Sequence, residues 1–153
     1  MREITIFAVT AGDIIHHWQI VEPLLESSMP CEIRRYWPID ILAQIIQGKQ
    51  QAWLVREGRE ILAVIVTQID QFPRRRGLTV FFLAGTRMVE WFDRAETIIT
   101  EYASRMGCDH FQTSGRRGWE RVIGIEPTTN FYTKDIIPEK PLNGASSTME
   151  API

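Results

Sequence analysis

The fold of this chain is decided by residues 108–124, which read CDHFQTSGRRGWERVIG. The first part predicts a short strand over Cys108–Ser114. Gly115 and Gly118 bound a tight turn, and an amphipathic pattern then predicts a short helix over Trp119–Gly124. The stretch is typical of a strand, a turn and a helix that follow one another closely.

A long helix is predicted directly before this stretch, from Thr86 to Met106, with Gly107 as its stop. Thr86 is its expected cap. The strand before the helix, Leu78–Ala84, is apolar on both faces. Because a helix joins the two strands, they should lie in one sheet and run parallel. The stripe of the helix expected to be buried is Val89, Phe92, Ile99, Tyr102 and Met106.

The first half of the chain predicts three further strands and two helices. Glu57-Gly58-Arg59 is typical of the tight turn of a hairpin. The strand after it, Glu60–Gln71, is rich in Ile and Val and should be central in the sheet. The other expected elements are a strand over Ile4–Val9, a helix after Asp13, a helix from Trp37-Pro38 to just before Gly48, and a strand over Ala52–Arg56.

The composition is that of a single globular domain. With 153 residues, of which 44% are hydrophobic and 24% charged, the chain can bury one core. We expect the domain to span residues 1–137. Residues 138–153 are rich in Pro, Ser, Gly and Ala, which predicts an extended or disordered tail.

Charge and cysteine content restrict the expected partners. The 17 basic and 19 acidic residues give no reason to expect a nucleic acid or a membrane. The longest apolar run without a charge, Ile61–Ile69, is too short to span a bilayer, and the N-terminal residues lack a signal-peptide core. Cys31 and Cys108 lack metal-ligand spacing, and the neighbouring His16 and His17 face different directions on a helix. We therefore expect no metal and a reduced, cytoplasmic setting.

Several short motifs carry a resemblance to a known superfamily. The most specific is GRRGWERV at 115–122, and VEPLL at 21–25 and FPRRR at 72–76 are weaker. With the element order, they resemble the GNAT (N-acetyltransferase-like) superfamily, most narrowly the GNAT-like proteins encoded by tailed bacteriophages. The resemblance implies an α/β fold whose mixed, mostly antiparallel sheet has a splayed parallel strand pair and flanking helices.

The resemblance also implies a place for acetyl-CoA. In this family the pantetheine pairs with the open edge of a splayed strand, and the pyrophosphate sits on N–H groups at the start of the next helix. The matching loop has only one glycine where the family has two small residues. From the residues alone, the alternative is a capped helix with an exposed arginine. The cofactor-binding residues implied are Leu83, Ala84, Gly85, Thr86 and Arg87.

The sequence does not identify the catalytic residues. The family often has a Glu on the strand before the loop, but Leu78–Leu83 has no ionisable side chain. Trp119 lies where the family often has a tyrosine acid, and Tyr132 matches that position poorly. His110 has suitable acid–base chemistry, with a structural role as the alternative.

Two functions follow from the resemblance. Arg116 and Arg117 suit contact with an anion or a protein partner, or else ion pairs within their own turn. The missing Glu, the missing Tyr and the incomplete loop favour a phage-encoded protein that has lost catalysis and binds a protein partner. Such a protein would act in virion assembly or against the host, in the host cytoplasm or in the virion. The alternative is an acyl-CoA-dependent N-acyltransferase.

Overall fold

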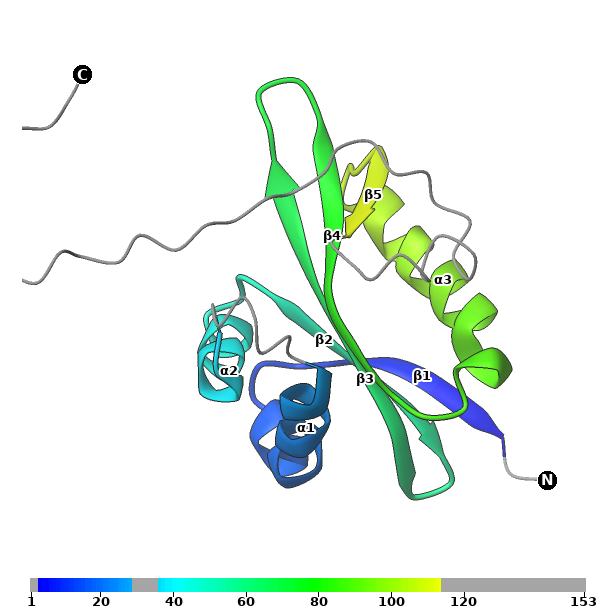
Figure 1. Cartoon of the computed structure of the whole chain (residues 1–153). Coiled ribbons are helices and arrows are strands. Elements are labelled where there is room, and N and C mark those ends of the chain that lie inside the picture. Colours follow the sequence, from blue (N-terminus) through cyan, green and yellow to red (C-terminus); the bar gives the residue numbers. More distant parts are fainter. Residues whose placement is uncertain (1–2, 29–35, 114–153) are drawn as a thin grey trace, which may run out of the picture. The chain divides into compact units, whose positions relative to one another are not determined.

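The structure is a computed structural model, and it describes residues 3–28 and 36–113. Within these residues the chain forms five strands and three helices, as Figure 1 shows. Their order is β1 (Ile4–Val9), α1 (Ile14–Ser28), α2 (Pro38–Ile46), β2 (Gln51–Glu57), β3 (Glu60–Gln71), β4 (Arg76–Gly85), α3 (Met88–Arg105) and β5 (His110–Thr113).

The strands form one sheet in the order β1-β2-β3-β4-β5. Neighbouring strands from β1 to β4 are antiparallel, whereas β4 and β5 run parallel and are connected through α3. β3 is the central strand, as its Ile- and Val-rich sequence predicted. The α/β fold with a mixed, mostly antiparallel sheet and one parallel pair is therefore confirmed.

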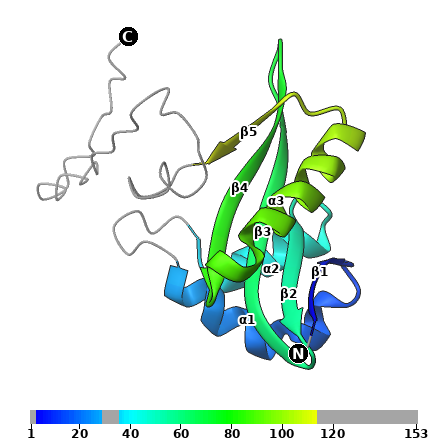
Figure 2. The same ribbon diagram turned by 90° about the vertical axis from the view of Figure 1, so that its right-hand side faces the viewer.

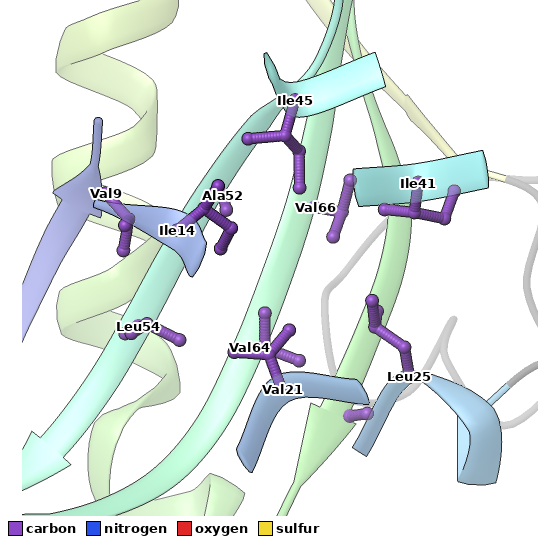
Figure 3. Packing of buried hydrophobic residues seen from close by; sticks show 11 residues of the cluster. Val9, Ile14, Val21, Leu25, Ile41, Ile45, Ala52, Leu54, Val64 and Val66 are labelled. Carbon is purple, nitrogen blue, oxygen red and sulfur yellow. The ribbon is translucent and has the colours of Figure 1, made fainter. Parts of the chain in front are cut away.

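Helices cover both faces of the sheet. α1 and α2 lie on one face, and α3 lies on the other (Figures 1 and 2). On the first face, alternate residues of β2 and β3 pack against both helices (Figure 3). The buried members of this cluster are Val9, Ile14, Val21, Leu25, Ile41, Ile45, Ala52, Leu54, Val64, Val66 and Ala84. Each large apolar side chain removed from water here stabilises the fold by about 1.5–3 kcal/mol.

Helix α2 begins where the sequence predicted. Pro38 is its first residue, where the missing N–H removes no helical hydrogen bond. The Trp37 backbone N–H donates to Asp40 Oδ2 at 2.8 Å, which fixes the entry into the helix. Ile41 and Ile45 then point into the core from adjacent turns (Figure 3).

Helix α3 buries a stripe that differs from the predicted one. Its buried residues are spaced by four, and of these only Ile99 was predicted. Val89 is 97% exposed and Met106 is 41% exposed, so both expectations were wrong. The prediction followed large apolar residues and passed over alanine, whereas small residues let a helix approach a sheet closely. The buried stripe is Trp91, Ala95, Ile99 and Ala103.

Several predictions concern residues that lie outside the described part of the chain. They are the short helix over Trp119–Gly124, the arginines Arg116 and Arg117, and the tail over residues 138–153. These stay predictions. Among the described helices, none combines the length and apolarity that crossing a membrane requires.

Candidate functional site

The parallel strands β4 and β5 pair over only part of β4. Their pairing runs from Gly77 opposite His110 to Val80 opposite Thr113. β4 continues to Gly85 and stays paired with β3 on its other side. Beyond Val80, the edge of β4 that faces away from β3 therefore has no partner strand among the described residues.

A β-bulge lies where this pairing ends. Val66 of β3 pairs with Phe82 and Thr67 pairs with Val80, so Phe81 is the extra residue on β4. A bulge bends its strand and increases the local twist. β4 therefore bends directly after Val80, its last residue that pairs with β5.

The turn from β4 into α3 is held against β3. A Cβ on Gly85 would lie 2.3 Å from Ala63 Cβ and 2.4 Å from the Leu62 carbonyl oxygen, so only glycine fits. The Thr86 N–H donates to the same Leu62 oxygen at 3.0 Å. Trp91 Nε1 donates to the Thr86 oxygen at 2.9 Å, which ties the turn to the first turn of α3.

The prediction that Thr86 caps α3 was wrong. The N-cap position belongs to Arg87, which has a left-handed backbone with φ of 58°, and no side chain caps the helix. The first N–H groups of an α-helix have no acceptor within the helix and carry its positive dipole end. The start of α3 therefore presents uncapped donors beside the open edge of β4.

Arg87 is bound by two carboxylates. Its Nη1 and Nη2 donate to the two Glu57 oxygens at 2.9 and 2.8 Å, and Nη2 donates to Glu90 Oε1 at 2.9 Å. The hydrogen bond to Glu90 and then that to Glu57 raise the pKa of the Arg87 guanidinium. The hydrogen bond between Arg87 and Glu90 also lowers the pKa of the Glu90 carboxyl. The Arg87 side chain thus does not cap the helix, although the residue occupies the N-cap position. Its guanidinium is paired and links the end of β2 to α3.

The other two residues of the predicted loop, Leu83 and Ala84, pack their side chains into the core. Ala84 is buried in the cluster under α1 and α2, and Leu83 is half-buried against the cluster under α3. Their side chains therefore point to opposite faces of the sheet, and what they offer at the open edge of β4 is backbone.

A chain of polar side chains crosses β3, β4 and β5 near the point where β4 and β5 separate. Asp70 is at its centre. Its Oδ2 accepts from Thr79 Oγ1 and, at 3.3 Å, from Gln112 Nε2, and its Oδ1 accepts from Gln68 Nε2 at 2.7 Å. Gln112 Nε2 also donates to Thr79 Oγ1 at 2.7 Å. All four side chains are half-buried. None of the four was predicted from the sequence.

His110 lies at the end of this row of polar side chains, where its contacts are mainly structural. Its ring lies over Gly77, where an added Cβ would be 2.5 Å from Nε2. Nδ1 bonds Asp109 Oδ1, and Nε2 is 3.3 Å from Gln112 Oε1. The hydrogen bond from His110, followed by the charge of Arg75, lowers the pKa of the Asp109 carboxyl. Of the two roles weighed for His110, these contacts favour the structural one.

The structure also brings a phenol to this region. The ring of Tyr36, which precedes α2, packs edge-on against Phe81 and Phe82, with centroids 5.9 and 6.2 Å apart. From the sequence, Tyr132 was the only candidate phenol, and it lies outside the described residues. Nothing in the local sequence around Tyr36 indicates its proximity to the bulge. Among the residues that the structure describes, no group of acidic, Cys or His side chains could hold a metal.

The fold is that of known acetyltransferases. No protein-family model matches the chain, and no curated protein is similar to it in sequence. A GNAT family acetyltransferase from Staphylococcus aureus subsp. aureus USA300_TCH1516 is similar in structure, with a TM-score of 0.63, 13% identity, and coverage of 89% of this chain and 100% of that chain. The chain therefore has the GNAT fold.

Two further solved structures contain the coenzyme. An aminoglycoside N-acetyltransferase in complex with CoA matches with a TM-score of 0.66 and 12% identity, over 89% of this chain and 97% of its own. A predicted acetyltransferase with acetyl-CoA from Clostridium acetobutylicum matches with a TM-score of 0.61 and 13% identity, over 87% of this chain and 96% of its own. At such identities the matches establish the fold alone.

Proposed function

We propose that this protein is an acyl-CoA-dependent N-acyltransferase with acetyl-CoA as its donor. The observation that carries the proposal is the geometry of β4. Its edge loses its partner strand after Val80 and leads directly to the uncapped start of α3. This arrangement suits a ligand with an extended amide-bearing arm and a phosphate end.

The residues fit such a ligand through their backbone. Main-chain groups of Phe81–Leu83 would pair with the pantetheine arm, and the N–H groups of Arg87 and the first turn of α3 would hold the pyrophosphate. Glu57 and Glu90 together outweigh the charge of Arg87, so we assign phosphate binding to the backbone donors and the helix dipole. When bound, the thioester supplies an activated acetyl group.

Calorimetric titration with CoA tests this proposal. We expect saturable heat and a rise in melting temperature, because a ligand at 100-fold its Kd stabilises the folded state by ~2.7 kcal/mol. Absence of both heat and thermal shift at millimolar CoA would contradict the proposal.

Variants at Arg87 and Glu57 sharpen this titration. Arg87→Ala should weaken CoA binding, since it leaves two carboxylates beside the phosphates. Glu57→Gln should strengthen binding, because the cluster of Arg87 and its two carboxylates then goes from a net charge of −1 to neutral beside the phosphates. Glu60→Gln is the matched control, because Glu60 faces Glu57 across the hairpin and has no described contact with Arg87.

A second candidate is a protein that has kept the fold and acts by binding a protein partner. The specific observation in its favour is that Arg87 is occupied by carboxylates while Leu78–Leu83 has no ionisable side chain. The narrower proposal of a phage-encoded protein acting in virion assembly or on the host belongs to this candidate. A negative CoA titration, followed by co-purification of a partner from expressing cells, would favour it.

A further inference from the structure

A cavity of about 500 Å³ lies at the first residues of β4, at the opposite end of this strand from the start of α3. Figure 1 shows that the hairpin of β3 and β4 projects beyond β2 there. β2 begins with Gln51 opposite Thr67, whereas β3 continues to Gln71. Residues 68–71 therefore have no partner on this side within the described ranges. The cavity is lined by this part of β3, by the residues that follow α2 and by the last turn of α3.

Among the described residues, the cavity lining includes two cationic side chains, Lys49 and Arg76, and no acidic one. Neither cation forms an ion pair with a carboxylate in the described part of the chain. The half-buried Arg76 side chain makes one hydrogen bond, from Nη1 to Gln71 Oε1 at 3.3 Å, and its Nε is buried without a described acceptor. A buried donor without an acceptor costs free energy. The guanidinium therefore has unused donors and a positive charge that its described neighbours do not compensate.

Gln51 adds an amide donor whose orientation is fixed by two buried neighbours. The indole N–H of Trp53 can only donate, and it donates to Thr67 Oγ1 at 3.0 Å. The hydroxyl proton of Thr67 is therefore left for Gln51 Oε1, which accepts it at 2.9 Å. Because the amide oxygen is used in this way, Gln51 Nε2 lies on the other side of the amide, where it has no described acceptor. Gln51 thus contributes N–H donors to the lining of the cavity.

The Tyr102 phenol supplies a further donor from α3. Its hydroxyl has no hydrogen-bond partner among the described residues, and burial raises the pKa of the phenol, so the hydroxyl stays protonated near neutral pH. Gln68, in contrast, has both ends of its amide occupied, since Nε2 donates to Asp70 and Oε1 accepts from Gln50. The free polar groups whose orientation or charge is fixed are therefore donors, and two of them are cations.

We propose that this cavity binds a small dianion, a compound that carries two carboxylate groups or one phosphate group. Both groups accept the paired donors of a guanidinium, which Arg76 supplies, and Lys49 supplies the second positive charge. The volume lies within the range of about 300–1,000 Å³ that is usual for small-molecule sites. The cavity is formed at the first residues of β4 and not at its open edge beyond Val80, so the inference does not depend on the proposed acyltransferase.

NMR of the full chain without CoA tests this inference. The signals to follow are the side-chain amide of Gln51 and the Nε–H of Arg76, during addition of disodium succinate up to ~100 mM, well above a Kd of ~1 mM. A parallel titration uses sodium phosphate, and the reference is sodium chloride at equal ionic strength. We expect both signals to shift with a saturable curve for at least one dianion, and the tighter binder identifies the anionic group. Sodium acetate, which has a single charge, should shift them less at each concentration.

Three variants localise the effect. Arg76→Gln should weaken binding of the dianion at least about tenfold, because it removes the charged fork. Lys49→Gln, at an exposed position after α2, should weaken it about two- to fivefold. Arg59→Gln is the matched control, because it removes an equal charge at an exposed position in the turn between β2 and β3 and should change nothing. Should Arg76→Gln fail to fold, Lys49→Gln and the titrations of the unmodified chain still decide.

The outcomes separate this inference from the proposed function. Shifts no larger than those with sodium chloride, saturable shifts only away from Gln51 and Arg76, or equal losses in Lys49→Gln and Arg59→Gln would overturn the inference. Equal affinity for acetate would overturn the assignment to a dianion. None of these results bears on CoA binding at the open edge of β4, and a chain that binds no CoA would leave the dianion site standing.

Discussion

At the scale of single residues, Gly85 has a packing role that is independent of any ligand. Family loops have small residues so that a phosphate can approach the backbone, but here the space that a side chain would need is filled by β3. The backbone φ of 153° adds a second reason for glycine. The glycine that marks the loop in the sequence is thus required by the sheet.

The substitution Gly85→Ala should lower the free energy of unfolding by about 1–3 kcal/mol, the usual cost of overpacking. The new Cβ would meet the Leu62 oxygen and Ala63, whose backbone atoms cannot move aside cheaply. Urea denaturation measures the change. Gly12→Ala is the control, since nothing lies within 4 Å of its added Cβ. Equal urea midpoints for the two variants would show that the turn accommodates a Cβ at residue 85 without loss of stability.

Asp109 predicts a pH dependence of stability. Its pKa in the folded chain lies below the ordinary value of an aspartate, mainly because of the hydrogen bond with His110. A lowered folded-state pKa contributes stability above the unfolded-state pKa, and this contribution is lost as the pH falls through the folded-state pKa.

Melting temperatures of the unmodified chain and of Asp109→Asn should therefore differ near about pH 7 and converge below about pH 4. A gap that stays constant through the acid range would mean that Asp109 acts through packing and not through its charge.

At the scale of elements, α3 shows how far sequence patterns extend. Seven of the eight described elements have both bounds within two residues of the predicted ones, because apolar periodicity and turn residues are local, and only the end of α1 was not predicted. The face of α3 was predicted less well, since alanines at 95 and 103 are buried while Val89 is exposed. Which face meets the sheet depends on close approach, and small residues carry little apolar signal.

The polar chain around Asp70 lies beyond what local patterns can predict. Its members come from three strands, and they meet only because the registers of β3 with β4 and of β4 with β5 align them. One signal was present, since Gln68 and Asp70 interrupt an apolar strand at a spacing of two. Two polar side chains on one face of a central strand indicate a polar environment there.

Substitutions on α3 test the observed face. Trp91 is 1% exposed, so Trp91→Ala should cost about 3–5 kcal/mol and remove the hydrogen bond to Thr86. Phe92→Ala should cost less, because Phe92 is only half-buried. Val89→Ala, at a fully exposed position, should change stability by less than ~0.5 kcal/mol. Denaturant titrations that reverse this order would assign the buried face to the originally predicted stripe.

At the scale of the whole molecule, the described domain brings an open strand edge and the start of a helix together. The open edge of β4 and the start of α3 together suit an extended anionic ligand. A shared fold does not establish a shared activity. The acyltransferase proposal requires that the donor lies along this edge and ends at the start of α3.

Backbone NMR of the chain with and without CoA tests the central claim most directly. If CoA lies along β4 and ends at α3, amide signals of Phe81–Leu83 and of Gly85–Val89 should shift together and saturate. Signals of β1 and of the outer side of α1 serve as internal controls and should stay unchanged. An absence of shifts at millimolar CoA, or saturable shifts only away from β4 and α3, would contradict the account.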